Sequence, residues 1–161
     1  MTGSGVARRV VPPAELAALV GRESFVSDWV LVDQARIDAF AAVTEDHQFI
    51  HVDPAAAALT PFGGTIAHGF LTLSLLAPMA MGAAVGVEGA TLGVNYGFDK
   101  LRFLQPVKSG SRIRGRFTLA DAREKGGAGR WLLAFDVSVE IEGESKPALA
   151  ARWLNMQLVP S

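Results

Sequence analysis

The histidines of this sequence are few and lie close together. His47, His51 and His68 are the only three in 161 residues, and all fall within a span of 22. The most polar stretch, residues 44–54, holds the first two and places Asp46 five positions before His51. An imidazole can accept and donate protons near neutral pH, and a carboxylate can hold a water or orient the imidazole. Asp46 and His51 are therefore the first candidates for an acid–base pair.

The spacing of Asp46 and His51 limits the backbone that could bring them together. On one α-helix they would point about 140° apart and could not act jointly. In a loop that turns back on itself, the two side chains can converge and hold a water between them. Without such convergence, Asp46 is a cap or loop residue and His51 a packed surface histidine. The residues alone leave this alternative open.

A metal site is a second alternative for the same stretch. His47 and His51 are four positions apart, the spacing at which helical histidines bind zinc, and Asp46 and His68 are nearby. Because the stretch is not an evident helix, neighbouring side chains would point in different directions. We therefore expect no metal and no redox cofactor.

The dipeptide His68-Gly69 opens a long apolar segment. The first N–H groups of a helix have no partner within the helix, and glycine lets a ligand approach the backbone closely. The N–H of Gly69 could therefore donate to a carbonyl oxygen that becomes negative during a reaction. The alternative is that Gly63, Gly64 and Gly69 only shape a turn.

The elements that must position these residues follow from the apolar pattern. Helices are predicted over residues 13–20, 34–43 and 55–59, with an irregular loop over residues 45–53 and a long helix over residues 68–85. A strand is predicted over residues 26–32. After Gly89 apolar residues alternate, which predicts four antiparallel strands over residues 91–103, 111–119, 130–142 and 148–158. Near Asp99 the apolar residues switch from one alternating set of positions to the other, which predicts a bulge or bend in the strand.

This layout predicts an α+β hot-dog fold, in which an antiparallel sheet wraps around a long central helix. We expect a disordered N-terminus over residues 1–11 and a single domain over residues 12–161. The strand order cannot be derived from the pattern. Arg112, Arg114 and Arg116 share one strand face, where they would meet phosphates of a coenzyme A tail or form a solvated outer face.

Composition excludes several classes of function. Half the residues are hydrophobic and the net charge is −1, which favours a globular domain and gives no reason to expect nucleic acid as a partner. Residues 62–87 carry no charged side chain, but glycine, threonine, serine, histidine and proline dilute them, so we expect a buried helix and not a membrane span. The absence of cysteine fits a reducing cytoplasm.

The chain resembles the MaoC-like (R)-specific enoyl-CoA hydratases, in particular the subgroup related to nodulation protein N. The resemblance lies in Asp46, His51, Asp53-Pro54 and His68-Gly69, taken in order. It continues through residues 93–97, 101–103 and 106–107 and covers roughly residues 25–157. One departure stands between the pair: Gln48-Phe49 replaces the usual Asn-Pro. Gln48 keeps an amide group on a longer side chain, so it could hold the water or adjust the acid–base properties of Asp46 and His51.

The resemblance implies a hydratase that adds water to trans-2-enoyl thioesters in fatty-acid metabolism. It implies Asp46 and His51 as catalytic residues and Gly69, Gln48 and His68 as oxyanion or substrate residues. The product would be a (3R)-3-hydroxyacyl thioester, carried on coenzyme A or an acyl-carrier protein. A thioesterase of the same fold and a non-catalytic acyl-thioester-binding protein are the alternatives. Because one such unit exposes sheet edges, we expect a homodimer.

Overall fold

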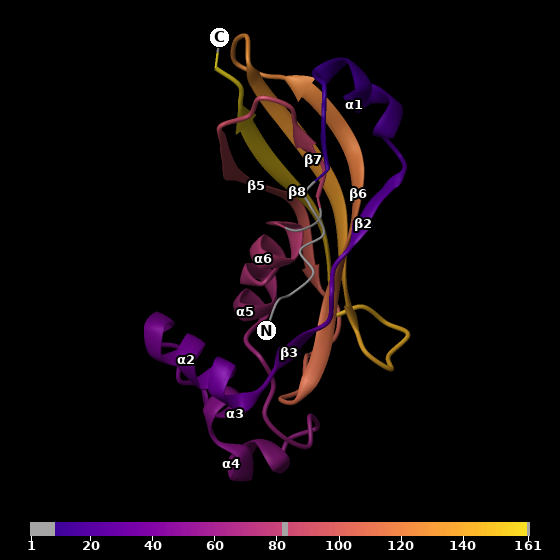
Figure 1. Cartoon of the computed structure of the whole chain (residues 1–161). Coiled ribbons are helices and arrows are strands. Elements are labelled where there is room, and N and C mark those ends of the chain that lie inside the picture. The colour runs from indigo at the N-terminus through magenta and orange to yellow at the C-terminus, as the bar shows by residue number, and fades with distance from the viewer. Residues whose placement is uncertain (1–8, 82–83, 161) are drawn as a thin grey trace, which may run out of the picture.

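One antiparallel sheet holds all the long strands of the computed structural model, which describes residues 9–81 and 84–160 (Figure 1). Along the strands in the middle of the sheet, apolar residues largely alternate with polar ones, so one face is buried there and the other is polar. In β6, for example, Ile113, Phe117 and Leu119 are fully buried. The long strands are β5 (Leu92–Phe103), β6 (Ser111–Glu124), β7 (Arg130–Ile141) and β8 (Leu149–Leu158).

The strand order is β2-β6-β7-β8-β5, so β5 forms one edge of the sheet. The single strand predicted over residues 26–32 is instead two strands, β2 (Glu23–Val26) and β3 (Val30–Val32). Both pair with β6, and between them the N–H of Ser27 donates to the carbonyl of Gly115. The Ser27 hydroxyl in turn accepts from the N–H of Gly115. These two hydrogen bonds continue the pairing with β6 between β2 and β3.

The bend predicted near Asp99 is confirmed. The pairing of β5 with β8 shifts register twice, between Asn95 and Gly97 and between Phe98 and Lys100. Extra residues of this kind bend a strand and increase its twist. The curved sheet wraps around two helices on its concave face (Figure 1), which is the predicted hot-dog arrangement.

The predicted long central helix lies at the expected position in the chain, but it is broken into two helices. It consists of α5 (Gly69–Ser74) and α6 (Leu76–Met81), which meet at Leu75. Pro78 explains the break, because proline has no N–H to donate to the carbonyl four residues earlier, that of Ser74, and its ring crowds that group. Leu71, Leu76 and Met79 still point into the core against the sheet.

Three short helices gather beyond one end of the sheet, next to α5 (Figure 1). They are α2 (Gln34–Thr44), α3 (Phe49–Val52) and α4 (Pro54–Ala58). Asp33 and Asp53 cap α2 and α4 by accepting hydrogen bonds from backbone N–H groups of the first turn. The loop predicted over residues 45–53 therefore contains one helical turn, α3, which carries His51.

The N-terminal region differs in part from the prediction. Residues 1–8 lie outside the described residues, but Val10–Val11 form strand β1, which pairs in parallel with β4 (Gly86–Val87). Helix α1 (Pro13–Leu19) follows and buries Leu16 in the core. The expected boundary at residue 11 thus falls inside an ordered segment. Among the described residues, no helix is both long and apolar enough to cross a membrane.

Candidate active site

Asp46 lies in the short connection between α2 and α3. Helix α2 ends at Thr44, and Glu45 adopts a left-handed conformation with φ of 61°, which turns the chain sharply. The Asp46 side chain is exposed, and its Oδ1 accepts a long hydrogen bond of 3.4 Å from the N–H of Gln48. The Asp46 side chain is therefore in contact with solvent.

His51 is buried on α3, with only 6% of its surface exposed. Its Nδ1 lies 2.7 Å from the carbonyl oxygen of Ile66. A carbonyl only accepts, so Nδ1 must carry the hydrogen and Nε2 has a free lone pair in the neutral ring. The backbone of Ile66 is fixed on two sides, because its N–H donates to the Ile50 carbonyl and it bridges to Lys108.

His68 is also buried, with 2% of its surface exposed, and precedes the first residue of α5. Its Nε2 lies 2.9 Å from the carbonyl oxygen of Asp46, so Nε2 donates. Its Nδ1 is buried, and no residue that the structure describes forms a hydrogen bond with it. The ring stacks on that of His51, with centroids 3.8 Å apart, and Phe40 packs against it at 5.1 Å.

The fold brings three of the predicted site residues to one point. Asp46, His51 and His68 each offer one carboxylate oxygen or ring nitrogen, and these three atoms lie within 4.8 Å of one another. The convergence of Asp46 with His51, which their spacing left open, therefore occurs. A water between the two side chains could be held and deprotonated there.

Gly69 and His51 share a cleft of about 360 Å³ between the start of α5 and the end of β5. An added Cβ at Gly69 would lie 3.1 Å from the ring of Phe103, so a larger residue would fill the gap. The N–H of Gly69 belongs to the first turn of α5, where no partner exists within the helix. The remaining walls include Thr72, Pro106 and Val107.

Gln48 lies at the N-cap position of α3, where its exposed side chain makes no capping hydrogen bond. It is near the pair in sequence, and its predicted contact with water remains a prediction. A different glutamine, Gln34, forms hydrogen bonds at the site, and the sequence analysis did not single it out. Its Nε2 donates to the His51 carbonyl at 2.7 Å, and its Oε1 accepts from the Thr65 hydroxyl at 2.5 Å.

Gln34 and Phe40 leave no signal in the sequence that connects them to the histidines. Gln34 stands 17 positions before His51, and Phe40 reads as one apolar residue of a helix. Phe103 had a partial signal, because it falls in one of the segments that carry the family resemblance. Only folding places its ring next to Gly69.

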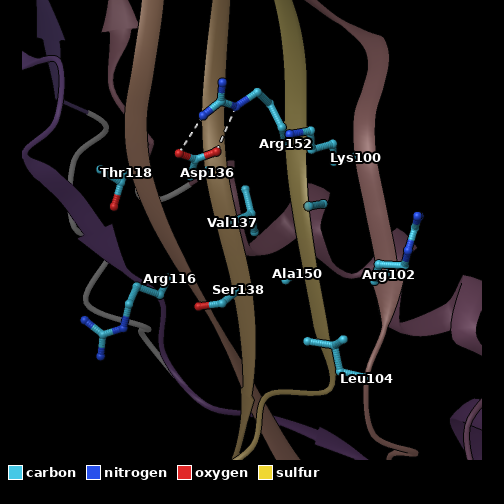
Figure 2. Close-up of a pocket in the computed structure, with 11 residues that line it drawn as sticks. Lys100, Arg102, Leu104, Arg116, Thr118, Asp136, Val137, Ser138, Ala150 and Arg152 are labelled. Carbon is cyan, nitrogen blue, oxygen red and sulfur yellow. Dashed lines mark hydrogen bonds and ion pairs between the residues drawn. The ribbon is translucent and has the colours of Figure 1, made fainter.

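The arginines of β6 lie on the outer, polar face of the sheet, away from the cleft. Arg114 and Arg116 bind Glu140 at 2.6 and 2.9 Å, and Arg112 pairs with Glu142. The same face holds a hollow of about 570 Å³, which Figure 2 shows together with the Arg152–Asp136 ion pair. No histidine lines this hollow, so it lacks the acid–base groups of the cleft.

Comparison with known proteins identifies a family to which the chain is related. Residues 15–130 match the model of the MaoC like domain. Nodulation protein N of Rhizobium meliloti (strain 1021) is 52% identical over 142 residues, which cover 88% of each chain. The 3-hydroxyacyl-thioester dehydratase Z of Mycobacterium tuberculosis is 46% identical over 138 residues, covering 86% of this chain and 90% of that protein.

The fold is similar to that of a solved hydratase. R-hydratase PhaJ1 of Pseudomonas aeruginosa superimposes with a TM-score of 0.68 at 27% identity, covering 95% of this chain and 89% of that one. Both the sequence and the structural matches extend over nearly the full length of this chain.

Proposed function

Because this chain belongs to the MaoC-like dehydratase family, we propose that it is an (R)-specific enoyl-thioester hydratase. It would add water reversibly to a trans-2-enoyl thioester and form the (3R)-3-hydroxyacyl thioester. Family membership supports hydration or dehydration as the class of reaction. The direction of the reaction and its stereochemistry are proposed beyond what family membership supports. Both are based on the similarity to the R-hydratase.

One observation carries the proposal: the Asp46 carboxylate and a ring nitrogen of His51 converge within 4.8 Å. The hydrogen bond from His51 Nδ1 to Ile66 fixes the tautomer, so Nε2 is the atom that can accept a proton. The exposed Asp46 can accept the other hydrogen of the same water. A water held by two acceptors is oriented with its oxygen lone pair free to attack.

In the proposed reaction, the water oxygen attacks carbon 3 of the enoyl group. His51 Nε2 takes one proton from that water, and the electrons of the double bond move to give an enolate. The proton on His51 then passes to carbon 2, which restores the thioester carbonyl. The water has thus added as hydroxyl and hydrogen, and His51 returns to its neutral form.

The enolate oxygen needs a hydrogen-bond donor, and we assign that role to the N–H of Gly69. It lies at the start of α5 in the cleft that also contains His51. A backbone donor aimed at developing negative charge contributes on the order of 3 kcal/mol to such reactions. The absence of a side chain at position 69 keeps the approach to this N–H open.

The substrate is proposed to be a coenzyme A or acyl-carrier thioester of fatty-acid metabolism. The cleft walls of Phe62, Phe103 and Val107 are apolar, which suits an acyl chain. A cytoplasmic location is part of the same proposal and is supported by the absence of cysteine.

We also propose a homodimer that pairs through strand β5. This strand is the edge of the sheet and exposes apolar side chains, with Leu92, Val94 and Tyr96 each between 43% and 51% exposed. An unpaired apolar edge favours association with a second copy. Light scattering should give twice the chain mass of 17.0 kDa, and a mass of 17.0 kDa would contradict the dimer.

The reaction is tested by following the loss of the conjugated enoyl-thioester absorbance across a series of chain lengths. Wild-type protein should consume the substrate and produce the (3R) alcohol, identified by chiral analysis. Release of free thiol without hydration would indicate a thioesterase. Binding of crotonyl-CoA without turnover would indicate a binding protein, and either result would overturn the proposal.

A further inference from the structure

A second cavity, of about 380 Å³, lies between α6 and the first half of β5. Helix α6 lines one side of it with Ala77, Ala80 and Met81, and the sheet lines the other. Among the described residues, none lines both this cavity and the cleft that contains His51 and Gly69. That cleft lies at the other end of β5, and about 8 residues of strand span roughly 26 Å. The cavity is therefore a separate place for a ligand.

Gln157 is the most buried polar residue of this cavity, with 1% of its surface exposed. Its Oε1 accepts a hydrogen bond of 2.8 Å from the N–H of Val87, which joins β4 to β8. A backbone N–H only donates, so this bond fixes which end of the amide is oxygen and leaves Nε2 as the second polar group. No residue that the structure describes accepts a hydrogen bond from Nε2. Because a buried donor without an acceptor is unfavourable, the cavity favours a ligand that supplies one.

Two further amides stand beside Gln157 on the same face of the sheet. Asn95 pairs with Asn155 in the ladder of β5 and β8, one step from the pair of Gly93 with Gln157. The indole N–H of Trp153 donates to Asn95 Oδ1 at 2.7 Å, so the remaining polar group of Asn95 is its NH₂. The sheet side of the cavity thus carries several hydrogen-bond donors.

The other walls restrict the ligand to uncharged groups. None of the described residues that line the cavity is charged, and Ala84, Val85 and Phe135 add apolar surface. A carboxylate or phosphate would lose its hydration there without a cation to replace it, which is costly. A ketone or hydroxyl oxygen accepts a hydrogen bond from an amide without that cost, and its hydrocarbon part suits the apolar walls.

We propose that this cavity binds an uncharged aliphatic group that carries a carbonyl or hydroxyl oxygen, and that this oxygen accepts a hydrogen bond from Gln157 Nε2. The site stands on the geometry alone. Two sources supply such a group: a free molecule, or the distal part of the acyl chain of a thioester. The second source rests on the proposed function and dimer. Two β5 strands paired about a two-fold axis run antiparallel, so the start of one lies toward the end of the other, where the partner's cleft is.

The test of binding is ¹⁵N-resolved NMR of the full-length protein titrated with butyl methyl ketone. The signals to follow are the side-chain NH₂ groups of Gln157 and Asn155 and the indole N–H of Trp153, and each should shift in a saturable manner. The hydrocarbon of the same shape, with a methylene group in place of the oxygen, should bind about three- to tenfold more weakly because it lacks one hydrogen bond. Absence of shifts at these signals, or equal affinity for the two probes, would overturn the proposal.

Gln157→Met assigns the hydrogen bond to its donor. Methionine has a similar length but no N–H, so the preference for the ketone over the hydrocarbon should disappear. A preference that remained would overturn the role of Gln157. Since this variant also loses the bond to Val87, a second variant keeps the site testable if it does not fold.

The second variant, Gly93→Val, fills the cavity. An added Cβ at Gly93 would lie 3.7 Å from Asn155 Oδ1 and 3.9 Å from Gln157 Cγ, so a larger side chain occupies the space over the amides. Gly93 is exposed, has no positive φ and lies in a strand, where valine is favourable. Ketone affinity should fall at least about tenfold. Gly64→Val is the matched control, because an added Cβ there meets nothing within 4 Å, and it should bind like the wild type. Equal affinity of Gly93→Val and Gly64→Val would overturn the site.

Kinetics distinguish the two sources of the ligand. If the acyl chain of the substrate enters the cavity, Gly93→Val should raise KM for long enoyl thioesters and leave KM for crotonyl-CoA unchanged. An unchanged KM at every chain length, with ketone binding lost in the same variant, assigns the cavity to a free molecule. Protein that binds the ketone but never hydrates an enoyl thioester would refute the proposed function and leave this site standing. Active protein without ketone-dependent shifts at Gln157 would refute only the cavity site.

Discussion

His51 and His68 lie with their imidazole rings stacked, the centroids 3.8 Å apart and the planes tilted by 26°. Each ring is held by one hydrogen bond to a backbone carbonyl, His51 to Ile66 and His68 to Asp46. The second bond ties the start of α5 to the connection that carries the Asp46 carboxylate. His68 thus contacts both members of the proposed acid–base pair and helps to fix their relative position.

The exposed carboxylate of Asp46 gives the clearest test of catalysis. Asp46→Asn keeps the size of the side chain but weakens its acceptor character, so kcat/KM for enoyl-thioester hydration should fall by about 10²–10⁴-fold. Because Asp46 is exposed, the unfolding free energy should change by less than about 0.5 kcal/mol. Absorbance kinetics and urea denaturation measure the two quantities, with His47→Ala as the matched control for both. Near-normal kcat/KM in Asp46→Asn would remove Asp46 from the mechanism.

Loss of the His68 ring should affect stability as well as activity. His68→Ala removes the hydrogen bond to the Asp46 carbonyl and the contacts with His51 and Phe40. The unfolding free energy should fall by about 1–3 kcal/mol, because a buried hydrogen bond and packed ring are lost. Urea denaturation measures this change. A variant as stable as the wild type would show that the ring does not fasten α5 to the loop.

Gly69 can be tested against a glycine that differs only in its surroundings. An added Cβ at Gly69 meets the Phe103 ring at 3.1 Å, whereas one at Gly64 meets nothing within 4 Å. Neither glycine has a positive φ, so alanine introduces no backbone strain at either position. Gly69→Ala should lower kcat/KM by about tenfold or more through crowding of the cleft, while Gly64→Ala should not.

Stability should change little in Gly69→Ala, because Phe103 is 48% exposed and its ring can move aside. We expect a change in unfolding free energy within about 1 kcal/mol. The combined variant Gly69→Ala with Phe103→Leu should regain part of the lost activity. Equal kinetics for Gly69→Ala and Gly64→Ala would contradict a substrate site at Gly69.

The outer face of the sheet predicts an acid-dependent loss of stability. A hydrogen bond from Arg114 holds the pKa of Glu140 below its usual value of 4.5, and Arg116 acts in the same direction against partial burial. A carboxyl whose pKa is lower in the folded state stabilises the protein above pH 4.5. That contribution is lost as the pH falls through the lowered folded-state pKa.

Glu140→Gln should therefore be less stable than the wild type at neutral pH by up to about 1 kcal/mol. The difference should shrink below pH 4.5 and disappear at more acidic pH, because the wild-type carboxyl is then protonated as well. Urea denaturation at several pH values measures this. A difference that stayed constant with pH would show that packing, and not charge, accounts for the effect.

Much of the fold could be predicted because its strands bury one face. In β7 the buried residues Phe135, Val137 and Val139 alternate with the exposed Asp136 and the half-buried Ser138, a pattern visible in the sequence. The bulge near Asp99 could be predicted for the same reason, because the alternation of apolar and polar residues changes phase there. The break at Leu75 was missed because apolar residues continue through it, and hydrophobicity alone does not report a lost hydrogen bond.

The sequence by itself determined which residue types were available for chemistry: one carboxylate, a few histidines and a glycine at a helix start. It also determined the alternation that builds the sheet. Only the tertiary structure decided which ring nitrogen is free, because the carbonyls that set it lie 15 residues from His51 and 22 from His68. Hydrogen bonds between such distant segments depend on how the helices pack, and no local pattern in the chain records them.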